Sequence, residues 1–216
     1  MLHKTRGIVF KYFKYRDTSI IAKILTEKLG LQTYIVNGIR SKNARGKIAL
    51  FQPLSLLDLI VYYKPNAEIN RISEVKSAEL YQNMPYKVIK SSIGVFLAEV
   101  LYKSVKEEGE ITEMFRFIYD SMIILDQLET GFENFHLQFM LKFTKYLGFG
   151  IDSAFMQEVP LLESNVRKLL FARYDEHINI SNEDRRSLLN LIIGFYKTHI
   201  DSFGELKSVN VLQEVL

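Results

Sequence analysis

The chain has 216 residues, 48% of them hydrophobic, and its 15 Phe and 12 Tyr supply ample apolar material for packed cores. These figures exclude an intrinsically disordered protein, and the length fits two modest domains. No apolar run reaches the roughly 18 residues that a membrane span needs. The absence of Cys excludes disulfides and thiolate zinc sites. No signal peptide is expected, because charged residues follow closely on the first ones, and the predicted location is cytoplasmic.

The net charge of +3 conceals an asymmetry between the two parts of the chain. Residues 1–80 carry 14 Lys and Arg against 6 Asp and Glu, a net charge of +8, whereas residues 81–216 carry 14 against 19, a net charge of −5. A basic first part indicates contact with a polyanion. Charge alone leaves a second interpretation open, in which this part is simply a solvated, mildly basic surface.

The first 80 residues are predicted to form β-strands. Residues 5–16 are rich in aromatic and β-branched side chains, and Ile8, Phe10 and Tyr12 recur at period two, which predicts that these three share the face toward the core. Four further strands are expected over residues 19–26, 33–36, 54–63 and 69–75. A polar, basic loop is expected over residues 38–47. Five short strands with one long loop favour a small closed or nearly closed barrel.

From about residue 86 the apolar residues follow a helical period instead. The stripe that contains Ile93, Leu97 and Leu101 predicts one helix, and residues 111–125 predict another. Residues 132–147 are apolar on nearly every side, which predicts a central, buried helix. Residues 148–180 are harder to interpret: a short helix is expected near Val166 and an extended piece near His177.

Two more helices are expected near the end of the chain. Ser181 is the predicted N-cap of the first, with Asp184 three residues further on, and residues 206–216 predict a short last helix. The fold class is therefore predicted as α+β, with a five-stranded barrel domain over residues 1–80 and an all-helical domain over residues 81–216.

Motifs for catalysis are missing from the sequence. There is no G-x-S-x-G elbow, no P-loop and no complete dinucleotide fingerprint. The four His lie far apart, and none has a partner at the helical spacing that metal sites use. The acidic clusters, such as Glu183-Asp184, lie at expected helix boundaries, where acidic side chains complement the helix dipole. We therefore expect no enzymatic activity, no cofactor and no metal.

Basic and aromatic residues occur together in two segments of the first part. Single-stranded nucleic acid is held by cations on its phosphates and by bases that stack on aromatic rings. By strand alternation, Tyr12 faces inward with Phe10, and Phe13 and Tyr15 share the side of Lys11. The candidate DNA-binding residues are the cations of the first strand and of the basic loop: Lys11, Lys14, Arg16, Arg40, Lys42, Arg45 and Lys47.

The order of several motifs resembles that of the RecO family. The residues Thr5-Arg6-Gly7-Ile8-Val9-Phe10, followed by Asp17-Thr18-Ser19 and Leu25-Thr26-Glu27-Lys28-Leu29-Gly30, are similar to the N-terminal opening of RecO proteins. The resemblance continues through Asn37-Gly38-Ile39-Arg40-Ser41-Lys42 and Ala49-Leu50-Phe51-Gln52-Pro53-Leu54. In the second part it covers Tyr146-Leu147-Gly148-Phe149-Gly150 and Leu206-Lys207-Ser208, and it is weakest over residues 151–180.

This resemblance implies an OB-fold barrel and a recombination mediator rather than an enzyme. RecO proteins bind single- and double-stranded DNA, anneal complementary strands and contact the acidic C-terminal tail of single-stranded-DNA-binding protein. Together with RecR they help to load RecA onto coated strands. The expected partners are therefore DNA, RecR and that tail, with RecA indirectly and no membrane. The alternative is a protein–protein scaffold in the same pathway with little DNA affinity of its own. A hydrolase or nuclease is a third and weaker hypothesis.

The sequence also departs from the family in two places. Many members bind zinc through four cysteines in the region that matches residues 151–180, and this chain has none there. Some members grip the acidic tail with an arginine pair on the central helix, where this chain has Leu137 and Gln138. Lys142 and Lys145, beside Leu141, are the alternative partner-binding candidates, and a solvated strip on a buried helix is the other interpretation of these lysines.

Overall fold

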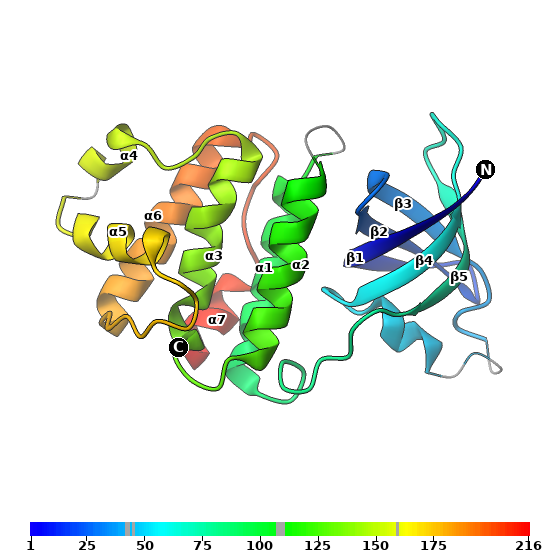
Figure 1. Cartoon of the computed structure of the whole chain (residues 1–216), viewed down its shortest axis with the longest axis horizontal. Coiled ribbons are helices and arrows are strands. Elements are labelled where there is room, and N and C mark those ends of the chain that lie inside the picture. Colours follow the sequence, from blue (N-terminus) through cyan, green and yellow to red (C-terminus); the bar gives the residue numbers. More distant parts are fainter. Residues whose placement is uncertain (42–43, 45, 107–110, 159) are drawn as a thin grey trace. The chain divides into compact units, whose positions relative to one another are not determined.

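The computed structural model describes residues 1–41, 44, 46–106, 111–158 and 160–216. Five strands form one sheet that closes on itself in the order β1-β2-β3-β5-β4 (Figure 1). All neighbours pair antiparallel except β3 and β5, which pair in parallel. The strands are β1 (Leu2–Tyr15), β2 (Ser19–Thr26), β3 (Gly30–Val36), β4 (Leu56–Tyr62) and β5 (Asn70–Ser77). The expected five-stranded barrel of OB-fold type is confirmed, and with it the α+β fold class.

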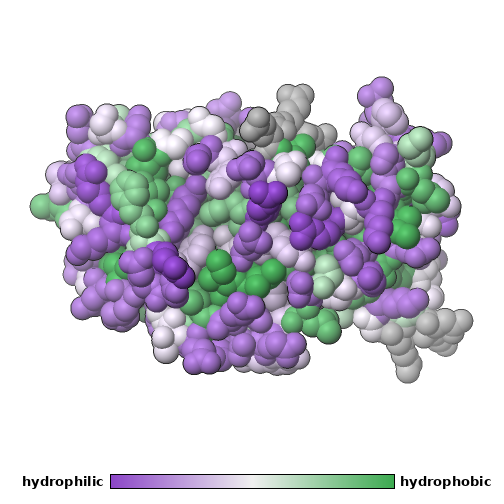
Figure 2. Space-filling model, viewed as in Figure 1, coloured by the Kyte–Doolittle hydropathy of each residue, from purple (hydrophilic) through white to green (hydrophobic). Residues whose placement is uncertain are grey.

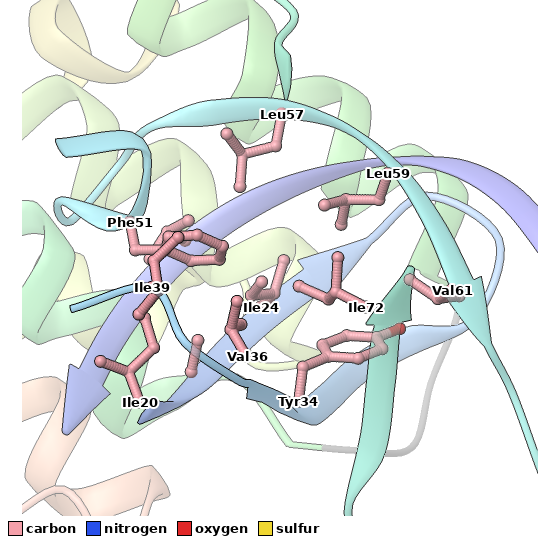
Figure 3. Close-up of a cluster of buried hydrophobic side chains, with 12 residues drawn as sticks. Ile20, Ile24, Tyr34, Val36, Ile39, Phe51, Leu57, Leu59, Val61 and Ile72 are labelled. Carbon is pink, nitrogen blue, oxygen red and sulfur yellow. The ribbon is translucent and has the colours of Figure 1, made fainter. Parts of the chain in front are cut away.

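The barrel interior is filled by alternating residues of the strands. Its core includes Ile20, Ile24, Tyr34, Leu59 and Val61, all at most 1% exposed (Figure 3). Gly7 also faces this interior, where a Cβ atom would lie 2.7 Å from Cδ1 of Leu59. Glycine at this position therefore lets β1 approach β4 closely.

A β-bulge in β1 changes which of its residues face the core. Val9 pairs with Ile24 and Lys11 with Lys23, so Phe10 is an extra residue on β1. Val9 and Tyr12 pack in the barrel core. Ile8 points away from that core and forms a second buried row with Leu25 and Leu56, its partners on β2 and β4. The prediction that Ile8 and Tyr12 share a face was wrong, because the extra residue of a bulge reverses the alternation.

The remaining elements are helical. The α-helices are α1 (Val88–Ser104), α2 (Ile111–Gln127), α3 (Phe135–Phe143), α4 (Ser153–Glu158), α5 (Glu163–Phe171), α6 (Asn182–His199) and α7 (Val209–Val215). The chain also forms the 3-10 helices η2 (Lys47–Phe51), η3 (Phe132–Asn134) and η4 (Thr144–Leu147). Every α3 residue except Lys142 is buried, as expected for a central helix, and α3 contacts α1, α5 and α6. The Asp184 backbone N–H donates to Ser181 Oγ over 3.0 Å, which confirms Ser181 as the α6 N-cap.

The described residues divide into two compact units. The barrel unit comprises Met1–Tyr81 with Val105–Tyr119, and the helical unit comprises Gln82–Ser104 with Asp120–Leu216. In the barrel unit, Arg6 of β1 makes a bidentate ion pair with Glu27 and lies 4.6 Å from the ring centroid of Tyr119. The hydrogen bond from Arg6 lowers the pKa of the Glu27 carboxyl. The division into domains over residues 1–80 and 81–216, expected from the sequence, stays a prediction.

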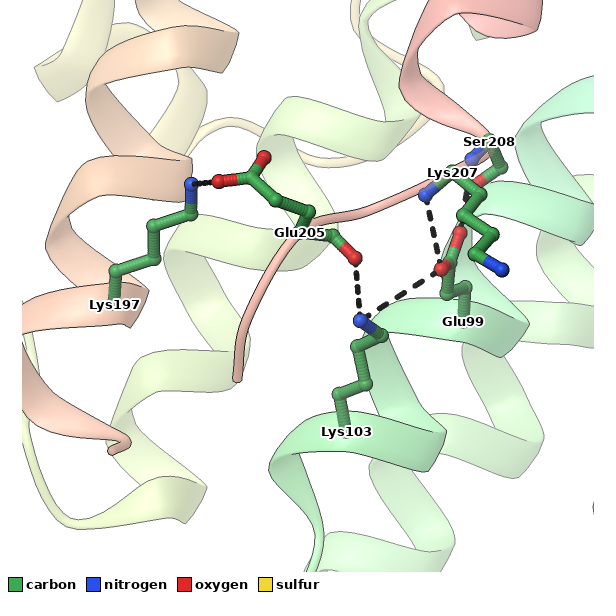
Figure 4. Close-up of polar contacts among 6 residues, drawn as sticks. All are labelled: Glu99, Lys103, Lys197, Glu205, Lys207 and Ser208. Atoms are coloured by element: carbon green, nitrogen blue, oxygen red, sulfur yellow. Dashed lines mark hydrogen bonds and ion pairs between the residues drawn. The ribbon is translucent and has the colours of Figure 1, made fainter. Parts of the chain in front are cut away.

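The C-terminal segment is anchored to α1 by one carboxylate (Figure 4). Glu99 accepts hydrogen bonds from the backbone N–H of Lys207, at 3.0 Å, and from the backbone N–H and hydroxyl of Ser208, at 2.9 and 2.6 Å. Lys103 donates to the carbonyl oxygen of Glu205, and Lys197 pairs with the Glu205 carboxylate. A carboxylate at a helix start satisfies backbone donors that have no partner within the helix, so this contact fixes where α7 begins.

Candidate nucleic-acid interface

The turn between β1 and β2 gathers cations from two distant segments. The Arg40 backbone N–H donates to the Thr18 carbonyl over 2.9 Å, and the Arg40 guanidinium donates to the Arg16 carbonyl over 3.2 Å. Arg16 has a left-handed backbone, with φ of 49°, and its guanidinium carbon lies 5.2 Å from the ring centroid of Tyr15. Positions 16 and 40 are therefore brought together at one end of the barrel.

The two candidate lysines of β1, Lys11 and Lys14, point to different faces of the strand. Lys11 is opposite Lys23, and its ammonium lies 5.0 Å from the ring centroid of Phe13. Lys14 is opposite the core residue Ile20, so its side chain is on the same side of β1 as that of Tyr12, which faces the barrel interior. Lys14 is nevertheless exposed, because it lies where β1 reaches the β1–β2 turn.

The basic loop after β3 leads into η2, which closes the same end of the barrel. Phe51 of η2 is fully buried and packs with Ile20 and Ile39 in the core (Figure 3). Lys47 is the first residue of η2 and is exposed. The structure thus places Lys14, Arg16, Arg40 and Lys47 around one end of the barrel. The other two predicted residues of this loop, Lys42 and Arg45, lie outside the described residues.

Two outward cations were missed by the sequence analysis. Lys23 is the cross-strand neighbour of Lys11, and Arg71 of β5 is opposite Ile35. The sequence contained a signal for both cations. Lys23 lies between Ala22 and Ile24, and Arg71 precedes Ile72, and these three neighbours face the barrel core. Strand alternation then turns both cations outward.

The partner-binding candidates of the helical unit do not form one exposed face. Leu141 is fully buried, so it cannot contribute to an exposed surface, whereas Lys145 is exposed. Lys142 is half-buried, and its ammonium donates to the Ala172 carbonyl and lies 4.8 Å from the ring centroid of Tyr174. Burial lowers the pKa of Lys142. The partner-binding role of these residues stays a prediction.

Lys142 also lines a hollow in the helical unit. This hollow has a volume of about 550 Å³. Its walls include the half-buried side chains of Ile124 and Leu128, the cations Lys142 and Arg173, and the carboxylates Glu129 and Asp175. Arg173 forms an ion pair with Asp175, at 3.0 Å. The hollow therefore combines apolar walls with groups of both charges.

Features of other site classes are scarce in the part of the chain that the structure describes. Among these residues, His, Asp and Glu form no group of three that could hold a metal ion. None of the described helices combines the length and hydropathy of a membrane span. On the face drawn in Figure 2, hydrophobic residues form separate patches among hydrophilic ones.

Comparison with known proteins assigns the chain to a family. Residues 1–81 match the model of the recombination protein O N terminal, and residues 86–155 match that of the recombination protein O C terminal. The chain belongs to the RecO family. It is 34% identical to the DNA repair protein RecO of Bacteroides fragilis over 240 residues, which cover all of this chain and 99% of the relative.

Other RecO proteins are similar along their whole length. The DNA repair protein RecO of Phocaeicola vulgatus is 33% identical over 239 residues, which cover all of this chain and 99% of the relative. That of Flavobacterium psychrophilum is 34% identical over 234 residues, 98% of each chain. The resemblance noted in the sequence is confirmed, and membership of the RecO family gives the chain a role in DNA repair and recombination.

Proposed function

We propose that the chain is a recombination mediator that binds single- and double-stranded DNA and anneals complementary strands. With RecR, it helps to load RecA onto strands coated by single-stranded-DNA-binding protein. The observation that carries the DNA-binding part is the pair of hydrogen bonds that hold Arg40 beside the β1–β2 turn, where Lys14 and Arg16 also lie. Cations from distant segments that converge at one end of a barrel make a surface for phosphates.

The chemistry of this surface is neutralisation of charge. Lys14, Arg16, Arg40 and Lys47 present ammonium and guanidinium groups that bind phosphates without reading base sequence. Two DNA strands repel one another through their phosphates, so a protein that lowers this repulsion brings complementary strands into contact. No covalent bond is made or broken in this step.

The helical unit supplies the contacts with proteins in this proposal. The acidic tail of single-stranded-DNA-binding protein would bind the apolar walls and the two cations of the hollow, Lys142 and Arg173, although Glu129 and Asp175 also line it. This hollow also supports the second candidate function, a scaffold that holds its protein partners and has little DNA affinity of its own.

The DNA-binding proposal is tested by removing two exposed cations at the end of the barrel. We expect the double substitution Lys14→Ala and Lys47→Ala to weaken binding of single- and double-stranded oligonucleotides by roughly tenfold, because each phosphate contact adds to a salt-dependent affinity. The loss should be equal for unrelated base sequences. Fluorescence anisotropy with labelled oligonucleotides at one salt concentration measures it.

The matched control removes two barrel cations elsewhere. Lys28 lies in the turn after β2, and Lys76 of β5 pairs with Asp58 at 3.3 Å. Lys28→Ala with Lys76→Ala makes the same change in net charge and should leave DNA affinity within about twofold. Equal losses in both double variants would show a diffuse effect of charge and refute a localised site. Feeble binding by the unaltered chain would favour the scaffold.

A further inference from the structure

The outer surface of the barrel next to the basic end carries a row of apolar side chains. The register places Phe13 opposite Ile21, Ile21 opposite Ile35, and Ile35 opposite Arg71. The adjacent row places Lys11 opposite Lys23. We call this surface the outer face, and it consists of Lys11, Phe13, Ile21, Lys23, Ile35 and Arg71.

The strand neighbours of these residues show that the outer face points away from the core. Tyr12, Ala22, Tyr34 and Ile72 each lie next to an outer-face residue and pack in the barrel interior. Phe13 is 43% exposed. The outer face therefore spans β1, β2, β3 and β5 as one surface with an apolar centre and cations at its edges.

The outer face combines exposed apolar area with positive charge. Phe13 is 43% exposed and keeps much of its apolar area in water. Lys11 and Lys23 lie opposite each other on neighbouring strands and concentrate positive charge on this face. A ligand that is negatively charged and also offers flat apolar groups matches both features.

We infer that the outer face binds the unpaired bases of single-stranded DNA, with Phe13 as the stacking platform. The inference rests on the proposed DNA binding and adds a preference for one form of DNA. Bases of a single strand can splay out and stack on aromatic side chains, while cations hold the phosphates between them. Lys11, whose ammonium lies 5.0 Å from the centroid of the Phe13 ring, and Lys23, opposite Lys11, supply those cations.

The outer face discriminates between the two forms of DNA because of where bases lie in a duplex. The bases of a duplex are stacked on one another and show only their edges in the grooves, so their flat faces do not reach Phe13. The cations at the barrel end contact phosphates, which both forms present. The barrel thus has a part that accepts either form and a part that accepts single strands alone.

Two substitutions of Phe13 separate stacking from folding. Phe13→Leu keeps an apolar side chain but removes the ring, and it should weaken single-strand binding on the order of tenfold, because stacking on one aromatic ring contributes that much affinity. Duplex binding should stay within about twofold. Phe13→Tyr keeps the ring and should retain both affinities. Phe171→Leu, at an exposed Phe of the helical unit, is the matched control and should change neither affinity.

A tryptophan at this position reports the contact directly. The chain has no Trp, so Phe13→Trp introduces a single fluorophore at the outer face. Single-stranded oligonucleotides should quench its emission at saturation, and duplexes of the same length should not. In the control variant Phe171→Trp, emission should be the same with and without either DNA.

The possible outcomes distinguish this inference from the proposed function. If the unaltered chain binds neither form of DNA, the proposed function fails. If it binds DNA but Phe13→Leu weakens both forms equally, or neither, or if duplex quenches Phe13→Trp as strongly as a single strand does, the stacking role of Phe13 is overturned and the phosphate site remains.

Discussion

Replacement of Asp126 by alanine should lower the free energy of unfolding of the chain by about 3 kcal/mol. The Asp126 carboxylate is buried and accepts hydrogen bonds from the backbone N–H groups of Gln82, Asn83 and Met84, at 2.9, 2.8 and 2.6 Å. Without it, three backbone donors at the start of the helical unit lose their acceptor. Chemical denaturation followed by circular dichroism measures the loss.

The charge of Asp126 also has a role in this site. Burial raises the pKa of its carboxyl, but the three backbone donors outweigh burial and leave the pKa lowered. The buried Lys90 ammonium donates to the Asp126 carbonyl over 2.7 Å. Asp126→Asn retains one acceptor oxygen and should lose about half as much stability as alanine. Asp120→Ala, at an exposed position of the same helix, should change stability by less than about 0.5 kcal/mol. Equal stability of all three variants would contradict this account.

Mild acid should destabilise the helical unit through one histidine. His136 is fully buried, and among the residues that the structure describes neither of its ring nitrogens has a hydrogen-bond partner. Burial, with the nearby charge of Arg185, lowers the pKa of His136 from 6.5 to about 3. The unfolded chain therefore binds more protons at this residue than the folded chain does between pH 6.5 and pH 3. The stability that depends on a neutral His136 is fully present above pH 6.5 and is lost as the pH falls. At pH 5 the free energy of unfolding should be lower by about 2 kcal/mol.

The variant His136→Leu tests this effect. In this variant the fall in stability between pH 6.5 and pH 5 should be absent, even if its stability at pH 7 differs from that of the unaltered chain. The control His177→Leu, at an exposed histidine, should keep the acid sensitivity of the unaltered chain. Thermal unfolding across this pH range measures it, and an unchanged slope in His136→Leu would refute the assignment.

Much of the fold could be predicted because it depends on local patterns. The expected second strand, residues 19–26, agrees with β2 at both ends, and Ser181 caps α6 as predicted. The face of each β1 residue could not be predicted, because nothing in the local sequence distinguishes Phe10 as an extra residue. The helix expected over residues 132–147 is divided into η3, α3 and η4, since apolar periodicity does not separate α-helical from 3-10 turns.

The candidate site could likewise be predicted only where it depends on local sequence patterns. The sequence supplied the cations, but only the hydrogen bonds of Arg40 bring it to Arg16, 24 residues away. Leu141 was proposed as a partner contact from its place beside two lysines, and the packing around α3 buries it. Burial of this kind depends on which helices cover a face, and that information is not local.

The central claim, that the basic end of the barrel binds DNA phosphates, is tested most directly by the salt dependence of single-strand binding. With about four to six phosphate contacts, the logarithm of the association constant should fall with the logarithm of salt concentration at a slope of roughly −3 to −4. Lys14→Ala with Lys47→Ala should reduce the magnitude of this slope by about one or more. A slope near zero, or the same slope in both proteins, would contradict the claim.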